Sequence, residues 1–187
     1  MRVLLIDFYD SFTYNLAHYL EAMELQLTVV RHDQLLPETL QTADAIVLSP
    51  GPGLPSEKEG LRNILQAFVG QKPILGVCLG MQALVEHLGG TLINQIQVKH
   101  GVSEKINILN GDGLFRHLPK EIEVGLYHSW MVRCPESWIS AKSLSGVPMA
   151  FERPELKVYG VQFHPESVLT PLGKEILRNF IEIVRHA

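Results

Sequence analysis

Short apolar runs alternate with amphipathic stretches along the first half of the chain. The apolar runs at residues 3–6, 25–30, 44–48 and 74–77 have the composition of buried parallel strands. Between them, apolar residues three and four positions apart predict helices. One is capped by Asp10 or Ser11, one spans residues 56–69 with Ser56 and Glu59 as a capping box, and one starts after residue 78. This alternation predicts βαβ units and a largely parallel sheet with helices on both faces.

The pattern changes after Thr91 to short β-rich segments without helical spacing. We expect strands at residues 105–109, 123–127, 147–151 and 157–163 as antiparallel extensions of the sheet, and a hairpin turn at Asn110-Gly111. A last amphipathic helix is expected from about Leu172 to Val184. Because no repeat, low-complexity tract or linker interrupts the pattern, we expect one domain over residues 1–187. Its expected fold class is α/β: three α/β/α layers, with a mostly parallel central sheet and antiparallel extensions in the C-terminal half.

The 187 residues are 46% hydrophobic and 19% charged, which is ordinary for a globular protein. The formal net charge of −4 offers no basic surface, so we expect no nucleic-acid partner. No apolar run approaches the ~20 residues that a membrane span needs, and Asp7 comes too early for a signal peptide. We therefore expect no membrane association and a reducing, cytoplasmic setting. The eight histidines and two cysteines lack paired metal-ligand spacing, so no metal site is expected.

Cys78 stands where the expected strand at residues 74–77 turns into a helix, with Gly76 and Gly80 on either side. This Gly-x-Cys-x-Gly layout is that of a nucleophile elbow, in which glycines relieve the crowding of a sharp turn. A thiol there lies at a helix N-terminus, which favours the thiolate, and the N–H of Leu79 is placed to stabilise an oxyanion. The alternative interpretation is a small apolar cysteine that packs beneath a glycine-rich turn.

A second candidate group follows the last expected strand, in a Phe-His-Pro-Glu segment at residues 163–166. In extended chain, His164 and Glu166 project to the same side, so Glu166 can orient His164 as a general base for Cys78. The loop at residues 49–53 alternates prolines with glycines, and the N–H of Gly53 is a candidate second oxyanion donor. The alternatives are a surface histidine beside a proline turn and an ordinary tight turn at residues 49–53.

Four motifs occur in order along the chain: Asp-Ser-Phe-Thr-Tyr-Asn-Leu at residues 10–16, Pro-Gly-Pro-Gly at 50–53, Gly-Val-Cys-Leu-Gly at 76–80 and Phe-His-Pro-Glu-Ser at 163–167. Together they closely resemble the class I glutamine amidotransferase family over nearly the whole chain. The first motif, with Tyr-His-Ser at 127–129, resembles the chorismate-using branch, which includes the glutaminase subunits of anthranilate synthase and aminodeoxychorismate synthase. The resemblance implies a flavodoxin-like α/β/α fold.

The resemblance also implies a reaction, in which Cys78 attacks the side-chain amide of L-glutamine, His164 transfers the proton and Glu166 orients His164. The backbone N–H groups of Gly53 and Leu79 would hold the oxyanion, and water would release glutamate from a glutamyl thioester. Four further residues would contact glutamine, namely Gly51, Gln82, Ser129 and Trp130. The ammonia would pass to a separate chorismate-binding synthase subunit. The family's magnesium belongs to that partner, so no cofactor is expected in this chain.

Three positions depart from the pattern of this branch. Met81 stands where histidine is usual, Val102 where lysine or arginine is common, and Trp130 where leucine is common. Two other function classes remain as alternatives: a stand-alone thiol hydrolase or peptidase on a similar fold, and a non-enzymatic binding or regulatory subunit. An amidotransferase subunit of another synthase is a further alternative. The sequence leaves open whether the product is anthranilate, aminodeoxychorismate or both.

Overall fold

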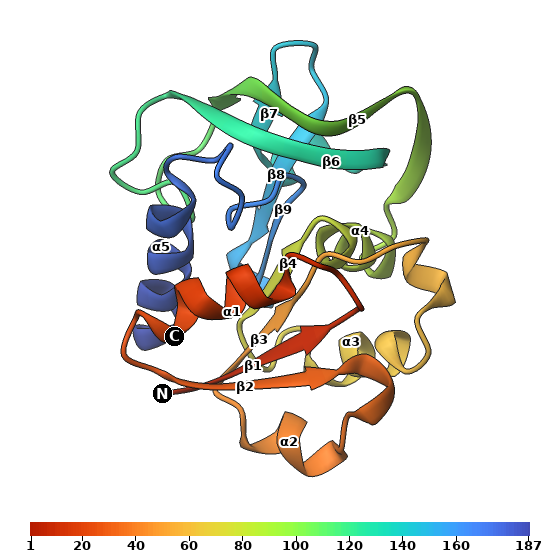
Figure 1. Cartoon of the computed structure of the whole chain (residues 1–187), viewed down its shortest axis with the longest axis vertical. Coiled ribbons are helices and arrows are strands. Elements are labelled where there is room, and N and C mark those ends of the chain that lie inside the picture. Colours follow the sequence, from red (N-terminus) through yellow and green to blue (C-terminus); the bar gives the residue numbers. More distant parts are fainter.

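A computed structural model describes the backbone of residues 1–187 and every side chain except those of residues 96 and 97. The described chain forms a nine-stranded sheet in the order β2-β1-β3-β4-β9-β8-β7-β5-β6 (Figure 1). The first five strands are mutually parallel: β2 (Gln26–Arg31), β1 (Arg2–Asp7), β3 (Ala45–Leu48), β4 (Ile74–Val77) and β9 (Val158–Val161). The others pair in antiparallel fashion: β8 (Pro148–Arg153), β7 (Ile139–Ser143), β5 (Thr91–Ile108) and β6 (Glu121–Arg133).

Helices cover the parallel part of the sheet on both faces. α1 (Thr13–Glu21) and α5 (Gly173–Arg185) pack on one face, since Leu16 and Phe180 share a buried cluster with Leu5 of β1. α2 (Pro37–Thr42), α3 (Leu61–Phe68) and α4 (Leu79–His87) pack on the other face, with Leu4 of β1 in their cluster. Successive residues of β1 thus point into opposite layers. The predicted three-layer α/β/α architecture with antiparallel extensions is confirmed.

The antiparallel extension closes over the carboxyl ends of β4 and β9. The carbonyl of Gly125, in β6, accepts the backbone N–H of His164 at 3.1 Å. Further along β6, the carbonyl of Trp130 accepts the side-chain amide of Gln82, in α4, at 3.3 Å. β6 therefore forms one wall of the edge where parallel α/β sheets usually carry their functional sites.

The prediction of a helix over residues 56–69 is wrong at its start. Pro55–Glu57 form a short 3₁₀ turn, and α3 begins at Leu61, directly after Gly60 with a φ of 78°. A left-handed residue breaks the helical path, and glycine adopts that conformation readily. Glu57, not Glu59, reaches back to the preceding chain, since its Oε2 accepts the N–H of Leu54 at 2.9 Å.

Caps and turns differ from the prediction at two other places. Neither Asp10 nor Ser11 is the N-cap of α1, because the helix begins after Phe12; Oδ1 of Asp10 instead accepts the N–H of Phe12 at 2.8 Å. Asn110-Gly111 is not a two-residue hairpin, because residues 109–120 separate the long strands β5 and β6. The Asn110 side chain forms only a local turn with the N–H of Asp112, at 3.0 Å.

The C-terminal strands also include one whose direction was wrongly predicted. Residues 158–161 form β9, which pairs with β4 in parallel and with β8 in antiparallel fashion, so this strand completes the parallel half of the sheet. The short helix α2 and the strand β7 were not predicted. The direction of a strand depends on the strand with which it pairs. The apolar pattern along the chain is the same for a parallel and an antiparallel strand, so this pattern could not predict the direction of β9.

The glycines on either side of residue 78 permit close packing of α4 against the sheet. A Cβ atom on Gly76 would lie 2.3 Å from the backbone carbon of Gly80. A Cβ atom on Gly80 would lie 2.6 Å from Cβ and from the carbonyl oxygen of Leu48, in β3. Because these obstacles are mostly backbone atoms, they cannot move aside by a change of rotamer.

Replacement of Gly76 by alanine should therefore destabilise the protein strongly. We expect Gly76→Ala to lower the free energy of unfolding by about 3 kcal/mol, the upper part of the range for overpacked sites. Gly111→Ala is the matched control, because a Cβ atom there meets nothing within 4 Å. Urea denaturation of both variants measures the difference. Equal stabilities for the two variants would show that α4 does not pack this closely on β4.

Candidate active site

Cys78 occupies a strained turn between β4 and α4. Its backbone has φ 53° and ψ −104°, a conformation that residues other than glycine rarely adopt. The sheet and the helix hold it there, since its N–H donates to the carbonyl of Val161 at 2.8 Å and its carbonyl accepts the N–H of Gln82 at 3.0 Å. Strain of this kind costs about 1–3 kcal/mol and is concentrated at functional sites. Cys78 is buried, with 6% of its surface exposed.

His164 and Glu166 form a buried pair just beyond the end of β9. Nδ1 of His164 and Oε1 of Glu166 are 2.7 Å apart, and both side chains are almost fully buried. A carboxylate accepts, so Nδ1–H is the donor and Nε2 is the nitrogen left for chemistry. Among the described side chains, Nε2 has no hydrogen-bond partner of ordinary geometry. The backbone is fixed as well, because Oγ1 of Thr170 donates to the His164 carbonyl at 2.7 Å.

The sulfur of Cys78 and the imidazole of His164 lie close enough to influence each other. Burial lowers the pKa of His164, but the neighbouring Cys78 and Glu166 side chains outweigh burial and raise this pKa to about 10. The imidazolium form is therefore favoured at neutral pH when it lies between a thiolate and a carboxylate. This arrangement is the one that a thiol nucleophile and its acid–base partner require.

The pairing of β4 with β9 brings these residues together. The two strands are parallel neighbours, with Ile74 opposite Val158 and Val77 opposite Val161. The chain that leaves β4 becomes the elbow at Cys78, and the chain that leaves β9 leads to His164. Residues far apart in the sequence thus emerge side by side at the carboxyl edge of the sheet.

The glycines of the loop after β3 lie in two different environments. Gly51 packs closely: a Cβ atom there would lie 2.7 Å from Cβ of Phe8 and 3.5 Å from Cδ1 of Leu79. Gly53 is exposed with a φ of 74°, and a Cβ atom there would collide with Oε2 of Glu57 at 2.1 Å. The structure thus brings Gly51 and Leu79 together, whereas Gly53 lies further out, on the surface. Their roles as substrate and oxyanion contacts stay predictions.

Gln82 is not the solvated surface residue that its place in the sequence suggests by default. It is 3% exposed, and its Nε2 donates to the carbonyl of Trp130 at 3.3 Å and to Oε1 of Gln162 at 3.2 Å. Ser129 and Trp130 are partly buried in β6. The resemblance thus placed Gln82 and Trp130 in one neighbourhood, and the structure does bring them into contact.

Sequence reasoning missed Gln162, which is fully buried and donates from Nε2 to Sγ of Cys78 at 3.5 Å. The alternation of an extended chain was the signal that could have found it. Alternation would put Gln162, His164 and Glu166, at positions i, i+2 and i+4, on one side of an extended chain. The prediction of extended chain is wrong here, because β9 ends at Val161 and the N–H of Ser167 donates to the His164 carbonyl at 3.2 Å, so residues 164–167 form a turn.

Aromatic side chains cover His164. The ring centroid of Tyr127 lies 4.8 Å from that of His164, and the ring centroid of Phe12 lies 5.4 Å from it. Asp7 shapes the loop that carries Phe12, because its Oδ1 accepts the N–H of Tyr9 at 2.9 Å and the hydroxyl of Thr13 at 2.8 Å. The β1–α1 loop is therefore part of the wall around the imidazole.

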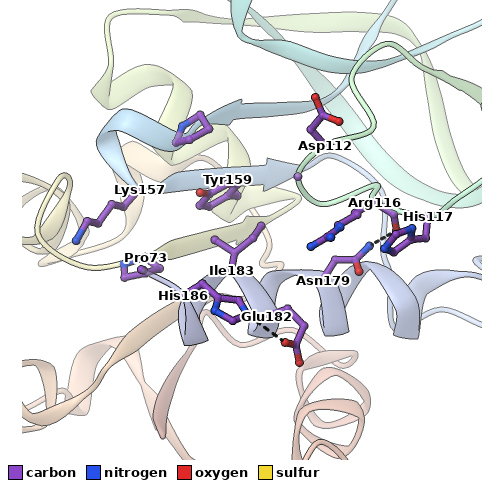
Figure 2. Close-up of a pocket in the computed structure, with 13 residues that line it drawn as sticks. Pro73, Asp112, Arg116, His117, Lys157, Tyr159, Asn179, Glu182, Ile183 and His186 are labelled. Carbon is purple, nitrogen blue, oxygen red and sulfur yellow. Dashed lines mark hydrogen bonds and ion pairs between the residues drawn. The ribbon is translucent and has the colours of Figure 1, made fainter.

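A separate open pocket of about 530 Å³ lies between α5, the loop after β5 and the amino ends of β4 and β9 (Figure 2). Its described lining mixes charges of both signs, including Arg116, Lys157 and Glu182, and contains none of the three side chains of the Cys-His-Glu group. The candidate active site is at the opposite end of these strands.

The described residues contain no cluster of three histidine, cysteine or acidic side chains arranged to hold a metal ion. In the described chain, no helix has the length and apolarity to span a membrane.

Comparison with known proteins finds one family model and several relatives that match nearly the whole chain. The sequence model of the family described as "Glutamine amidotransferase class-I" matches residues 4–184. The chain is 41% identical over 187 residues to anthranilate synthase component 2 of Lactococcus lactis, which covers 97% of this chain and 94% of that protein. It is 38% identical over 190 residues to aminodeoxychorismate/anthranilate synthase component 2 of Bacillus subtilis, which covers 98% of this chain and 97% of that protein.

Solved structures support the same fold. A Thermoplasma acidophilum protein described as belonging to a GMP synthase aligns with a TM-score of 0.89 and 26% identity, covering 100% of this chain and 94% of that one. A glutamine amidotransferase of Thermotoga maritima aligns with a TM-score of 0.80 and 18% identity, covering 100% and 99%. The second likeness concerns the fold alone.

His128, in β6 beside the candidate site, has an environment that makes folding sensitive to acid. It is 4% exposed, and its Nδ1–H donates to the carbonyl of Trp130 at 2.9 Å. Burial lowers the pKa of His128 to about 4, although the Trp130 carbonyl acts in the opposite direction. Since the unfolded chain takes up a proton near pH 6.5 and the folded chain does so only near pH 4, folding opposes protonation in this range.

The wild-type protein should accordingly lose stability relative to His128→Gln as the pH falls from 7.5 to 4. The expected relative loss is about 3 kcal/mol, from a pKa difference of about 2.5 between the two states. Urea denaturation of both proteins across this range measures it. His18→Gln, at an exposed position of α1, controls for removal of a histidine as such. A difference between wild type and His128→Gln that stays constant with pH would contradict the prediction.

Proposed function

The chain belongs to the class I glutamine amidotransferase family, and we propose that it is the glutaminase subunit of a chorismate-using synthase. It hydrolyses L-glutamine to glutamate and ammonia and delivers the ammonia to a chorismate-binding partner, for anthranilate or 4-amino-4-deoxychorismate synthesis or both. The observation that carries this proposal is the strained Cys78 beside an imidazole whose pKa is raised to about 10. The full-length similarity to component 2 proteins of both kinds supports the choice of pathway.

The first half of the proposed reaction forms a thioester. The Cys78 thiolate attacks the side-chain amide carbon of glutamine, and the negative charge moves to the amide oxygen. The N–H groups of Gly53 and Leu79 stabilise this oxyanion. When the intermediate collapses, Nε2–H of His164 protonates the departing nitrogen, so ammonia leaves and a γ-glutamyl thioester remains.

The second half regenerates the enzyme. Neutral His164 removes a proton from water through Nε2, the hydroxide attacks the thioester carbon, and glutamate and the Cys78 thiolate are released. Glu166 keeps Nδ1 protonated and the ring aligned in both halves. Four residues hold the amino-acid portion of the substrate, namely Gly51, Gln82, Ser129 and Trp130. The contact between Gln82 and the Trp130 carbonyl supports this grouping.

The remaining parts of the proposal concern the setting of the reaction. We assign no cofactor to this chain, because the thiol, the imidazole and backbone donors suffice for amide hydrolysis. The entire chain, residues 1–187, acts as one domain, and the continuous sheet supports this assignment. We assign this domain to the cytoplasm. The chorismate-binding partner receives the ammonia, as the two-component names of the relatives suggest.

Replacement of the nucleophile should separate glutamine use from ammonia use. In the complex with its native partner, Cys78→Ser should lower glutamine-dependent product formation by at least about 1,000-fold, as for nucleophiles of comparable hydrolases. Activity with added ammonium salt should be unchanged, because the partner's chemistry does not involve the thiol. Cys134→Ser, at a half-buried position in a loop, is the control. Identification of the product distinguishes anthranilate from aminodeoxychorismate, and glutamine use by Cys78→Ser would refute the assignment.

The two members of the histidine–glutamate pair should differ in importance. His164→Ala removes the group that moves the proton, whereas Glu166→Ala removes only its orientation and charge. We expect the loss of kcat to be at least about tenfold larger for His164→Ala than for Glu166→Ala. Glu166→Gln, which preserves side-chain volume, controls for the cavity that alanine leaves. Equal or reversed losses of kcat would contradict the assigned roles.

A further inference from the structure

The side chain of Gln162 touches the nucleophile and has no part in the mechanism described above. It is fully buried, and its Nε2 lies 3.5 Å from Sγ of Cys78, within the range of an N–H···S hydrogen bond. A primary amide in such a position is either a donor to the sulfur or an acceptor that faces it, depending on which way the amide is turned.

The neighbouring groups determine which way the amide is turned. The carbonyl of Trp130 can only accept, so the end of Gln82 that faces it at 3.3 Å must be the NH₂ end. The same NH₂ group lies 3.2 Å from Gln162, so the end of Gln162 that faces Gln82 must be the acceptor Oε1. The NH₂ end of Gln162 is then directed to the sulfur. A chain of hydrogen bonds thus runs from Cys78 through two buried amides to a backbone carbonyl.

The backbone holds Gln162 as firmly as it holds the nucleophile. The N–H of Gln162 donates to the carbonyl of Met149 in β8 at 2.8 Å. The preceding residue, Val161, accepts the N–H of Cys78 through its carbonyl, also at 2.8 Å. The backbones of Gln162 and Cys78 are therefore anchored to the same strand end, and the hydrogen bond from Gln82 to Oε1 of Gln162 holds the amide itself beside the sulfur.

We propose that Gln162 is a catalytic residue that donates a hydrogen bond from Nε2 to the Cys78 thiolate, stabilising the anion and aligning it for attack. The assignment rests on the proposed function, since it takes Cys78 as the nucleophile. A donor that faces a thiolate favours the charged form, because hydrogen bonds to ions are stronger than those to neutral groups. His164 supplies the proton from one side, and Gln162 stabilises the sulfur from another. The same series of hydrogen bonds connects the sulfur to Gln82, which is a proposed contact of the substrate L-glutamine.

The test measures the reactivity of the sulfur directly, independently of glutamine turnover. In a Cys134→Ser background, so that Cys78 is the one remaining thiol, the rate of alkylation by iodoacetamide is followed from pH 5 to 10. Gln162→Met preserves approximate volume and removes the donor. We expect the midpoint of the alkylation profile to rise by about one pH unit. In the complex, kcat for glutamine should fall about tenfold while KM stays within about twofold.

Two further variants sharpen the result. Gln66→Met, at an exposed position of α3, makes the same chemical change away from the sulfur and should leave the alkylation profile and kcat unchanged. Gln162→Glu keeps the shape but replaces the donor by an acceptor, so its midpoint should rise at least as far as that of Gln162→Met. This variant also serves if the methionine variant fails to fold.

The outcomes are separable from failure of the proposed function. An alkylation midpoint that does not rise in a folded Gln162 variant overturns the role of Gln162, whatever the fate of glutamine turnover. If Cys78→Ser still used glutamine, the nucleophile itself would be wrongly assigned, and the alkylation profiles would have no bearing on catalysis. A fall in kcat with an unchanged alkylation profile would mean that Gln162 acts only on the packing of the site, which also overturns the proposal.

Discussion

The hydrogen-bonded ladder between β4 and β9 is the constraint on which the rest of the structure depends. It is a parallel pairing of two four-residue strands that are buried throughout, with Gly76 opposite Gly160 at its centre. Beyond its last pair, one strand leads into the elbow and the other into the segment with the imidazole. Backbone hydrogen bonds from Cys78 to β9 and from His164 to β6 extend the ladder. The sheet therefore holds the backbone of both reacting residues in fixed positions.

The backbone conformation at Cys78 is energetically unfavourable, and Cys78 is the residue that carries the proposed nucleophile. Cys78 adopts a positive φ although it carries a side chain, and the carboxylate and imidazole beside it are buried with little contact to water. Such features persist only where the surroundings leave no alternative. At Cys78, Gly76 and Gly80 let the backbone of α4 lie directly on the sheet. The side-chain amide of Gln162 donates to the sulfur, and the side-chain amide of Gln82 donates to Gln162.

Local pattern was enough to predict the strands that begin the fold, because fully apolar runs such as residues 3–6 and 74–77 have few other uses in a soluble protein. It was also enough to single out the turn at Cys78. Local pattern failed where the structure depends on residues that are far away in the sequence. The direction of β9 is set by its partner β4, and the burial of Gln82 is set by β6, which lies over α4. The late start of α3 had a local signal in Gly60 that was not recognised.

The chain between α4 and β9, residues 88–157, contributes four strands to the sheet, and two of these strands hold the segment that follows β9: the carbonyl of Met149 in β8 accepts the N–H of Gln162, and the carbonyl of Gly125 in β6 accepts the N–H of His164. A shift in the register of β6 or β8 would therefore move the imidazole relative to the sulfur, so a substitution in these strands can impair the reaction without touching either reacting group.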